Sequence, residues 1–107
     1  MAWFQLLLAG ALEIVWALGL RTTEGFTRPV PTLITVGAIA ASMALLAQAA
    51  RTLPIGTAYA IWVGIGATGA AIGGALLFDE SMPPLRVTFL VLLVVSVVGL
   101  KLTAAAP

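Results

Sequence analysis

Glu13 is a single carboxylate within an apolar run, and it is the residue of this chain best placed to do chemistry. From Ala2 to Leu20 every residue except Gln5 and Glu13 is apolar. As a helix this run is about 28 Å long, close to the thickness of the hydrocarbon core of a membrane. A side-chain charge at that depth costs about 2.5–3.5 kcal/mol even on lenient insertion scales, so a carboxylate there indicates a functional site, usually for a proton or a cation.

A buried carboxyl group of this kind can exchange a proton for a cation. Both ions would compete for the same oxygens, which is the minimal requirement for an antiporter. If two copies of Glu13 faced one cavity, the two groups would titrate as one coupled unit. A planar guanidinium would match a carboxylate through two parallel N–H···O bonds, which a quaternary ammonium ion cannot form.

Several residues could complete a site around this carboxylate. On a helix Glu13 shares its face with Gly10 and Trp16, so there is space beside the carboxylate and an indole N–H within reach. Ser42 is the only hydroxyl near the middle of the second apolar run. Its hydroxyl is expected either to reach the central carboxylate or to bond a carbonyl of its own helix.

The third apolar run adds aromatic rings and glycines. Tyr59 and Trp62 lie three residues apart and therefore stack on one helical face with Gly66. They are expected either to line the cation site or to belong to an aromatic belt at the membrane interface. Gly64 and Gly66 lie near the middle of the run and are candidates for a hinge between two conformations.

The composition places the chain among membrane proteins. Of its 107 residues 62% are hydrophobic and only nine are charged, five Lys or Arg and four Asp or Glu. It has no cysteine and no histidine, which excludes disulfides and thiolate metal sites. It has no basic run for nucleic acid, and no phosphate-binding loop, activated nucleophile or metal cluster. The sequence therefore predicts no enzyme and no metal or cofactor, with protons as the coupling ion.

Four apolar runs must position these residues. We expect one domain over residues 1–107, with membrane-spanning helices at about 2–20, 30–50, 55–78 and 85–100. Prolines stand where the later runs begin, which suits the first turn of a helix because it does not need their missing N–H. The runs lack the two-residue alternation of barrel strands, so the predicted fold is an all-α membrane protein.

The orientation of these helices in the membrane is weakly specified. Four spans place both termini and the second loop on one side, with Arg51 and Lys101. The other side carries Arg21, Arg28 and Arg86. This near balance of positive charge favours insertion in both orientations over one weakly biased topology. Because the chain has one intramembrane carboxylate, an antiparallel homodimer would supply two.

Several motifs together resemble the small multidrug resistance transporter family over essentially the whole chain. They are Glu13, the first-loop sequence Gly25-Phe26-Thr27-Arg28, the run from Pro54 to Trp62 that enters the third helix, and Gly64-Ile65-Gly66. The resemblance implies an antiparallel, dual-topology homodimer in the bacterial inner membrane. It further implies that the dimer exchanges protons for cations by alternating access at two shared Glu13 carboxylates.

Within this family the chain looks most similar to the guanidinium exporter branch. Gly10, Trp16 and Lys101 match that branch, and Ile39 stands where the multidrug branch typically has tyrosine. The resemblance implies that a network of side chains orients Glu13 while Tyr59 lines the cavity. The residues of that network would be Gly10, Trp16, Ser42 and Trp62.

We therefore expect a proton-coupled exporter of guanidinium and small substituted guanidinium ions. Its expected partners are these cations, a second copy of the chain and the lipid bilayer. Three alternatives remain at this stage: export of quaternary ammonium compounds, a structural membrane subunit without transport, and a heterodimer with a related chain.

Overall fold

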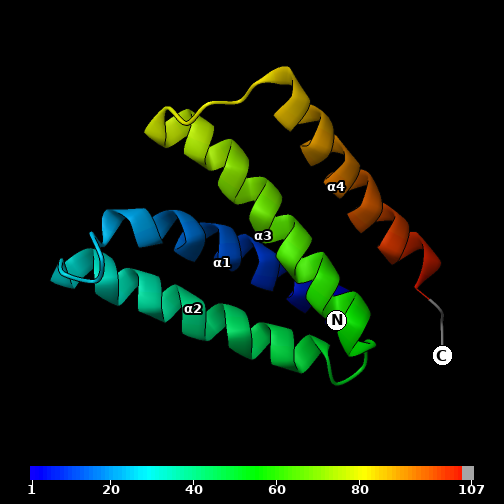
Figure 1. Ribbon diagram of the computed structural model, residues 1–107. Coiled ribbons are helices and arrows are strands. Elements are labelled where there is room, and N and C mark those ends of the chain that lie inside the picture. The colour runs from blue at the N-terminus through cyan, green and yellow to red at the C-terminus, as the bar shows by residue number, and fades with distance from the viewer. Residues whose placement is uncertain (105–107) are drawn as a thin grey trace.

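The computed structural model describes residues 1–104 and consists of four long helices. These are α1 (Ala2–Thr22), α2 (Pro29–Ala49), α3 (Ile55–Phe78) and α4 (Pro84–Thr103) (Figure 1). Each is long and apolar enough to cross a membrane, which confirms the predicted all-α membrane fold. The first and last helices continue to Thr22 and Thr103, beyond the ends expected at residues 20 and 100.

Prolines mark the beginnings of three helices, as the sequence indicates. Pro29 and Pro84 stand in the first turns of α2 and α4, and Pro54 is the residue immediately before α3. The fixed backbone angle of proline suits these positions, and its missing N–H would be unpaired there in any case. The helix ends are thus set locally by the chain.

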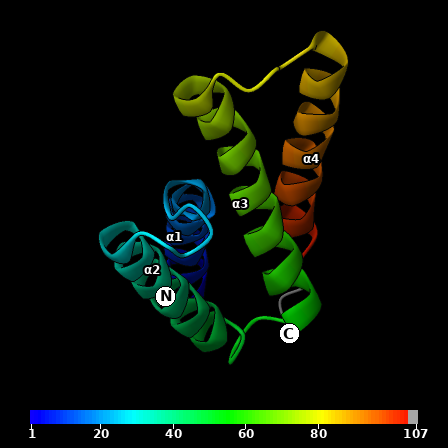
Figure 2. The same cartoon turned by 60° about the vertical axis from the view of Figure 1, so that its left-hand side comes forward.

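The four helices do not form a symmetrical bundle. In this protomer α1 lies between α2 and α3 and packs against both, whereas α2 and α3 touch only slightly (Figures 1 and 2). The backbone of the fourth helix approaches only α3, and none of the residues of this helix is buried. The first three helices therefore form the packed part of the protomer, and α4 stands apart from it.

Glycines allow α1 and α3 to approach closely. A Cβ at Gly69 would overlap the side chain of Ile14, and a Cβ at Gly73 would lie 2.5 Å from a methyl group of Leu18. The two glycines are four residues apart, as are the two α1 residues that pack on them. Small residues at this spacing let helix backbones come together, which is a main source of packing energy within a membrane.

The buried apolar side chains gather in the half of the bundle where the N-terminus and the α2–α3 loop lie. They are Leu6, Ala9, Leu46, Ala49, Ala58, Ile61 and Trp62. Large apolar side chains elsewhere are mostly exposed in the protomer, as expected of surfaces that face lipid or another membrane helix.

The α1–α3 contact makes a testable prediction about stability. Gly69→Ala places a methyl group against Ile14 and should lower the free energy of unfolding by about 1–3 kcal/mol, because the helices must move apart. Gly56→Ala is the matched control in the same helix, since a Cβ there meets no atom within 4 Å. Thermal unfolding of both purified variants in detergent measures the difference. Equal stability of the two variants would contradict this packing.

Candidate functional site

Glu13 lies in the middle of α1 and is 9% exposed, and its carboxyl group packs on α3. A Cβ at Gly66 would overlap that carboxyl group, so the carboxylate lies directly on a bare stretch of α3 backbone. Its Oε1 atom is buried and has no hydrogen-bond partner among residues 1–104. A buried acceptor of this kind is rare in proteins, so this oxygen has hydrogen-bonding capacity that the described residues do not use.

Trp16 adds a second unpaired polar atom close by along α1. Its indole Nε1 is buried and likewise has no partner within the described part of the chain. The ring of Trp16 lies 6.5 Å from that of Trp62, and the ring of Tyr59 lies 5.6 Å from Trp62, measured between centroids. These three rings form an aromatic row from α1 to α3, one end of which neighbours Glu13.

Ser42 connects the three packed helices through two buried hydrogen bonds. Its hydroxyl donates to the backbone carbonyl of Ala9 at 2.6 Å and accepts from the indole Nε1 of Trp62 at 3.0 Å. Both partners expected from the sequence are therefore wrong, because the Ser42 hydroxyl bonds the α1 backbone and not the Glu13 carboxylate or a carbonyl of its own helix. Ala9 is four residues before Glu13, so this pair of bonds fixes the turn of α1 that precedes the carboxylate.

Gly10 provides a close contact one turn before Glu13. A Cβ there would lie 2.7 Å from the Cγ2 atom of Ile65, so only glycine leaves space for this α3 side chain. Tyr59, in contrast, is 53% exposed in the protomer and presents its ring outside the packed helices. The structure thus places Gly10, Trp16, Ser42 and Trp62 around Glu13's part of α1, with Tyr59 at the edge.

The two candidate hinge glycines lie within a continuous helix, since α3 runs unbroken from Ile55 to Phe78. The Glu13 carboxyl group packs on Gly66, and a Cβ at Gly64 would overlap the side chain of Val97 from α4. Each glycine therefore has a packing role in this conformation, and a hinge motion at this point stays a prediction.

Lys101 lies in the last turn of α4, beside the beginning of α1 and away from Glu13. Its Nζ atom is 4.8 Å from the centre of the Trp3 ring, a distance suited to a cation–π contact. Because α4 otherwise packs only on α3, this contact links the end of α4 to the beginning of α1. The sequence indicated Lys101 but not its contact with Trp3. It also did not indicate that Ile65 packs on Gly10 or that the Ala9 carbonyl accepts a hydrogen bond from Ser42.

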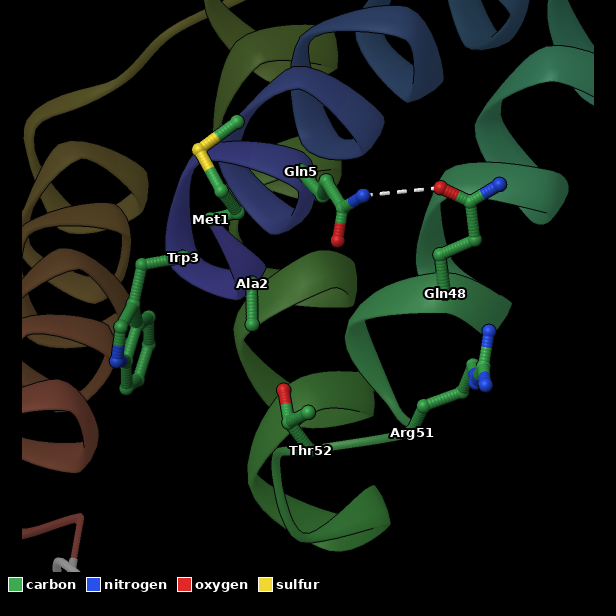
Figure 3. Close-up of a pocket in the computed structure, with 7 residues that line it drawn as sticks. All are labelled: Met1, Ala2, Trp3, Gln5, Gln48, Arg51 and Thr52. Atoms are coloured by element: carbon green, nitrogen blue, oxygen red, sulfur yellow. Dashed lines mark hydrogen bonds between the residues drawn. The ribbon is translucent and has the colours of Figure 1, made fainter.

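A separate cavity with both apolar and polar lining residues opens at the same end of the protomer. It has a volume of about 540 Å³, and the amide of Gln5 donates across it to Gln48 at 2.9 Å (Figure 3). Arg51 and Thr52 complete its polar lining. It does not include Glu13 or the aromatic row. No cluster of three metal-binding side chains occurs within residues 1–104.

The fold and the site define a class of protein. It is a small, multi-pass helical membrane protein with one carboxylate inside its four spanning helices, an arrangement typical of ion-coupled transport. The chain belongs to the Small Multidrug Resistance protein family, whose sequence profile matches residues 1–93.

Curated relatives cover nearly the whole chain. A guanidinium exporter from Citrobacter freundii is 56% identical over 103 residues, which are 96% of this chain and 98% of that protein. Guanidinium exporters from Salmonella typhimurium strain LT2 and Escherichia coli strain K12 are 58% and 55% identical, again over at least 96% of this chain and 98% of theirs. With four spanning helices and these relatives, the chain is a multi-pass protein of the bacterial inner membrane.

The two hydrogen bonds of Ser42 predict that losing this buried hydroxyl costs more stability than losing an exposed one. Ser42→Ala leaves the buried Trp62 N–H without a partner and removes the hydroxyl's bond to the Ala9 carbonyl, so it should lower the free energy of unfolding by about 1–3 kcal/mol. Ser96→Ala is the control, since Ser96 is exposed on α4. Thermal unfolding in detergent measures both changes. If Ser96→Ala were as destabilising as Ser42→Ala, the hydrogen-bond assignment would be wrong.

Proposed function

We propose that this protein exports guanidinium and small substituted guanidinium ions in exchange for protons. The observation that carries the proposal is the 55–58% identity to guanidinium exporters along nearly the full length of both chains. The buried Glu13 carboxylate supplies a chemical basis, because proton and guanidinium would compete for its two oxygens. No cofactor, metal or catalytic step is part of this proposal.

In this proposal the side chains around Glu13 orient the carboxylate and shape the space beside it. Ser42 and Trp62 hold the preceding turn of α1 through the hydrogen bonds described above. Trp16 offers its unpaired N–H close to the carboxylate, and its ring can stack on a planar cation. Gly10 keeps α1 close to α3, and Tyr59 lines the outer side of the cavity.

The transport unit in this proposal is an antiparallel homodimer of copies inserted in both orientations. Two features of the protomer support a second copy: α4 buries none of its residues, and apart from the Lys101–Trp3 contact it packs only on α3. A dimer brings two Glu13 carboxylates to one cavity, and alternating access then exposes them to each side in turn. Bending at Gly64 and Gly66 would supply the motion, and Lys101 on Trp3 would keep the end of α4 in place.

The central prediction concerns proton movement in reconstituted liposomes. Guanidinium added outside the liposomes should enter in exchange for internal protons, so the interior should become more alkaline. Glu13→Gln should abolish this flux because the amide can neither release a proton nor pair with the cation. A pH-sensitive dye inside the liposomes measures the flux. Glu24→Gln is the matched control, since that carboxylate lies in the exposed α1–α2 loop and its loss should leave the flux intact.

Other outcomes of this experiment identify the alternatives. Flux with a lipophilic quaternary ammonium ion but none with guanidinium would replace the proposed substrate with the multidrug class. No flux with either cation would favour a structural membrane subunit. Guanidinium flux that survives Glu13→Gln would remove this residue from the site.

Dual topology makes its own prediction, which the natural absence of cysteine makes easy to test. A cysteine at Thr52, exposed in the α2–α3 loop, should react with a membrane-impermeant maleimide from both sides of the membrane in whole cells and inverted vesicles. Phe26→Cys, in the loop at the opposite end, should give the same two-sided result. Labelling of each position from one side only would establish a single topology instead.

A further inference from the structure

A second carboxylate, Glu80, packs on a glycine of α3 in the same manner as Glu13. A Cβ at Gly74 would overlap the Glu80 carboxyl group, and the backbone N–H of Glu80 donates to the Gly74 carbonyl at 3.3 Å. The chain turns back here because Asp79 adopts a left-handed conformation with φ of 55°. The carboxylate is thus positioned by the end of α3.

This carboxylate holds a guanidinium group of the protein itself. Arg21 Nη1 donates to Glu80 Oε2 at 3.3 Å, and the Arg21 Cζ atom lies 5.1 Å from the centre of the Phe78 ring. The guanidinium therefore meets a carboxylate and an aromatic face together. The C-terminal end of α3 adds the negative end of its helix dipole, which also favours a cation.

The other ion pair found among residues 1–104 is built differently. Arg28 and Glu24 are 3.8 Å apart, four residues from each other in the same loop region. Neither residue takes part in a cation–π contact or in a close contact with a glycine among those found in residues 1–104. Of these two pairs, only the one at Glu80 has its carboxylate packed on a glycine and its guanidinium on an aromatic ring.

The Glu80 pair also lies on the same helix contact as Glu13. Gly66 under Glu13 and Gly74 under Glu80 are eight residues apart on α3, which corresponds to about 12 Å. Glu13 and Arg21 are likewise eight residues apart on α1 and share one face of that helix. The α1–α3 contact thus has a carboxylate in the middle of the membrane and another at its loop end.

We propose that Glu80 and Phe78 form a peripheral guanidinium-binding site, which the Arg21 side chain occupies here and where free guanidinium exchanges with it. The proposal rests on the proposed function, since it assigns a second position to the same substrate. The Arg21 and Glu80 side chains are 62% and 42% exposed. Because ion pairs exposed to solvent to this extent are weak, free guanidinium can displace the Arg21 side chain. The site would bind guanidinium at the loop end of the α1–α3 contact.

The test measures guanidinium binding at Glu80 in protein that lacks the central carboxylate. Full-length Glu13→Gln protein in lipid bicelles is titrated with guanidinium chloride at constant ionic strength, and the backbone amide NMR shifts of Phe78 and Glu80 are followed. Adding Arg21→Gln removes the competing side chain and should tighten the dissociation constant about two- to fivefold, the range expected when a weak exposed pair is lost.

Two further variants decide the outcome. Arg28→Gln in the same background is the matched control and should leave the titration unchanged. Glu80→Gln should abolish the saturable shifts. The proposal is overturned if Arg21→Gln and Arg28→Gln give the same titration, or if the shifts survive Glu80→Gln. The second criterion holds even if Arg21→Gln fails to fold.

This experiment is separate from the test of transport. Because Glu13 is absent throughout, missing shifts at Phe78 and Glu80 would remove the peripheral site and leave guanidinium export intact. Saturable shifts in a protein whose wild type moves no guanidinium would support binding at Glu80 while export failed.

Discussion

The contact between the Glu13 carboxyl group and the bare backbone of α3 at Gly66 is the constraint on which the rest of this structure depends. A carboxyl group inside a membrane is unfavourable unless protein surrounds it, so α1 must lie with this face against other helices. Glycine is the residue that leaves space for the carboxyl group there. The glycines that follow along α3 continue the same close approach toward the loop end.

The polar interactions around this contact hold α1 in a single position. Ser42 bonds the α1 backbone and receives the indole N–H of Trp62, so one hydroxyl connects α1, α2 and α3. With the Ser42 hydroxyl and the Trp62 N–H bonded to each other, four buried side-chain atoms within residues 1–104 have no partner: Glu13 Oε1, Trp16 Nε1, Thr32 Oγ1 and Thr68 Oγ1. Two of these four atoms belong to residues proposed to meet a proton or a cation.

The protomer is packed unevenly, and this has consequences for assembly. Three helices share a small core, whereas α4 is attached through α3, with Val97 against Gly64, and through Lys101 on Trp3. A helix without buried residues leaves its apolar surface available to another copy, as the proposed antiparallel dimer requires. At the loop end, Arg21 on Glu80 presents within the protein the same chemical group that the proposed substrate carries.

The four spans, the prolines at the beginnings of three of them and the single carboxylate within them could all be predicted from the sequence, because they follow from local composition. The sequence also indicated Trp16, Ser42 and Trp62 as polar residues near the middle of the membrane. Only the tertiary structure decided their partners: Ala9 for Ser42, Ser42 for Trp62, Trp3 for Lys101 and Glu80 for Arg21. These pairings depend on how each helix is rotated about its axis, which long-range packing of glycines against side chains sets and local sequence does not.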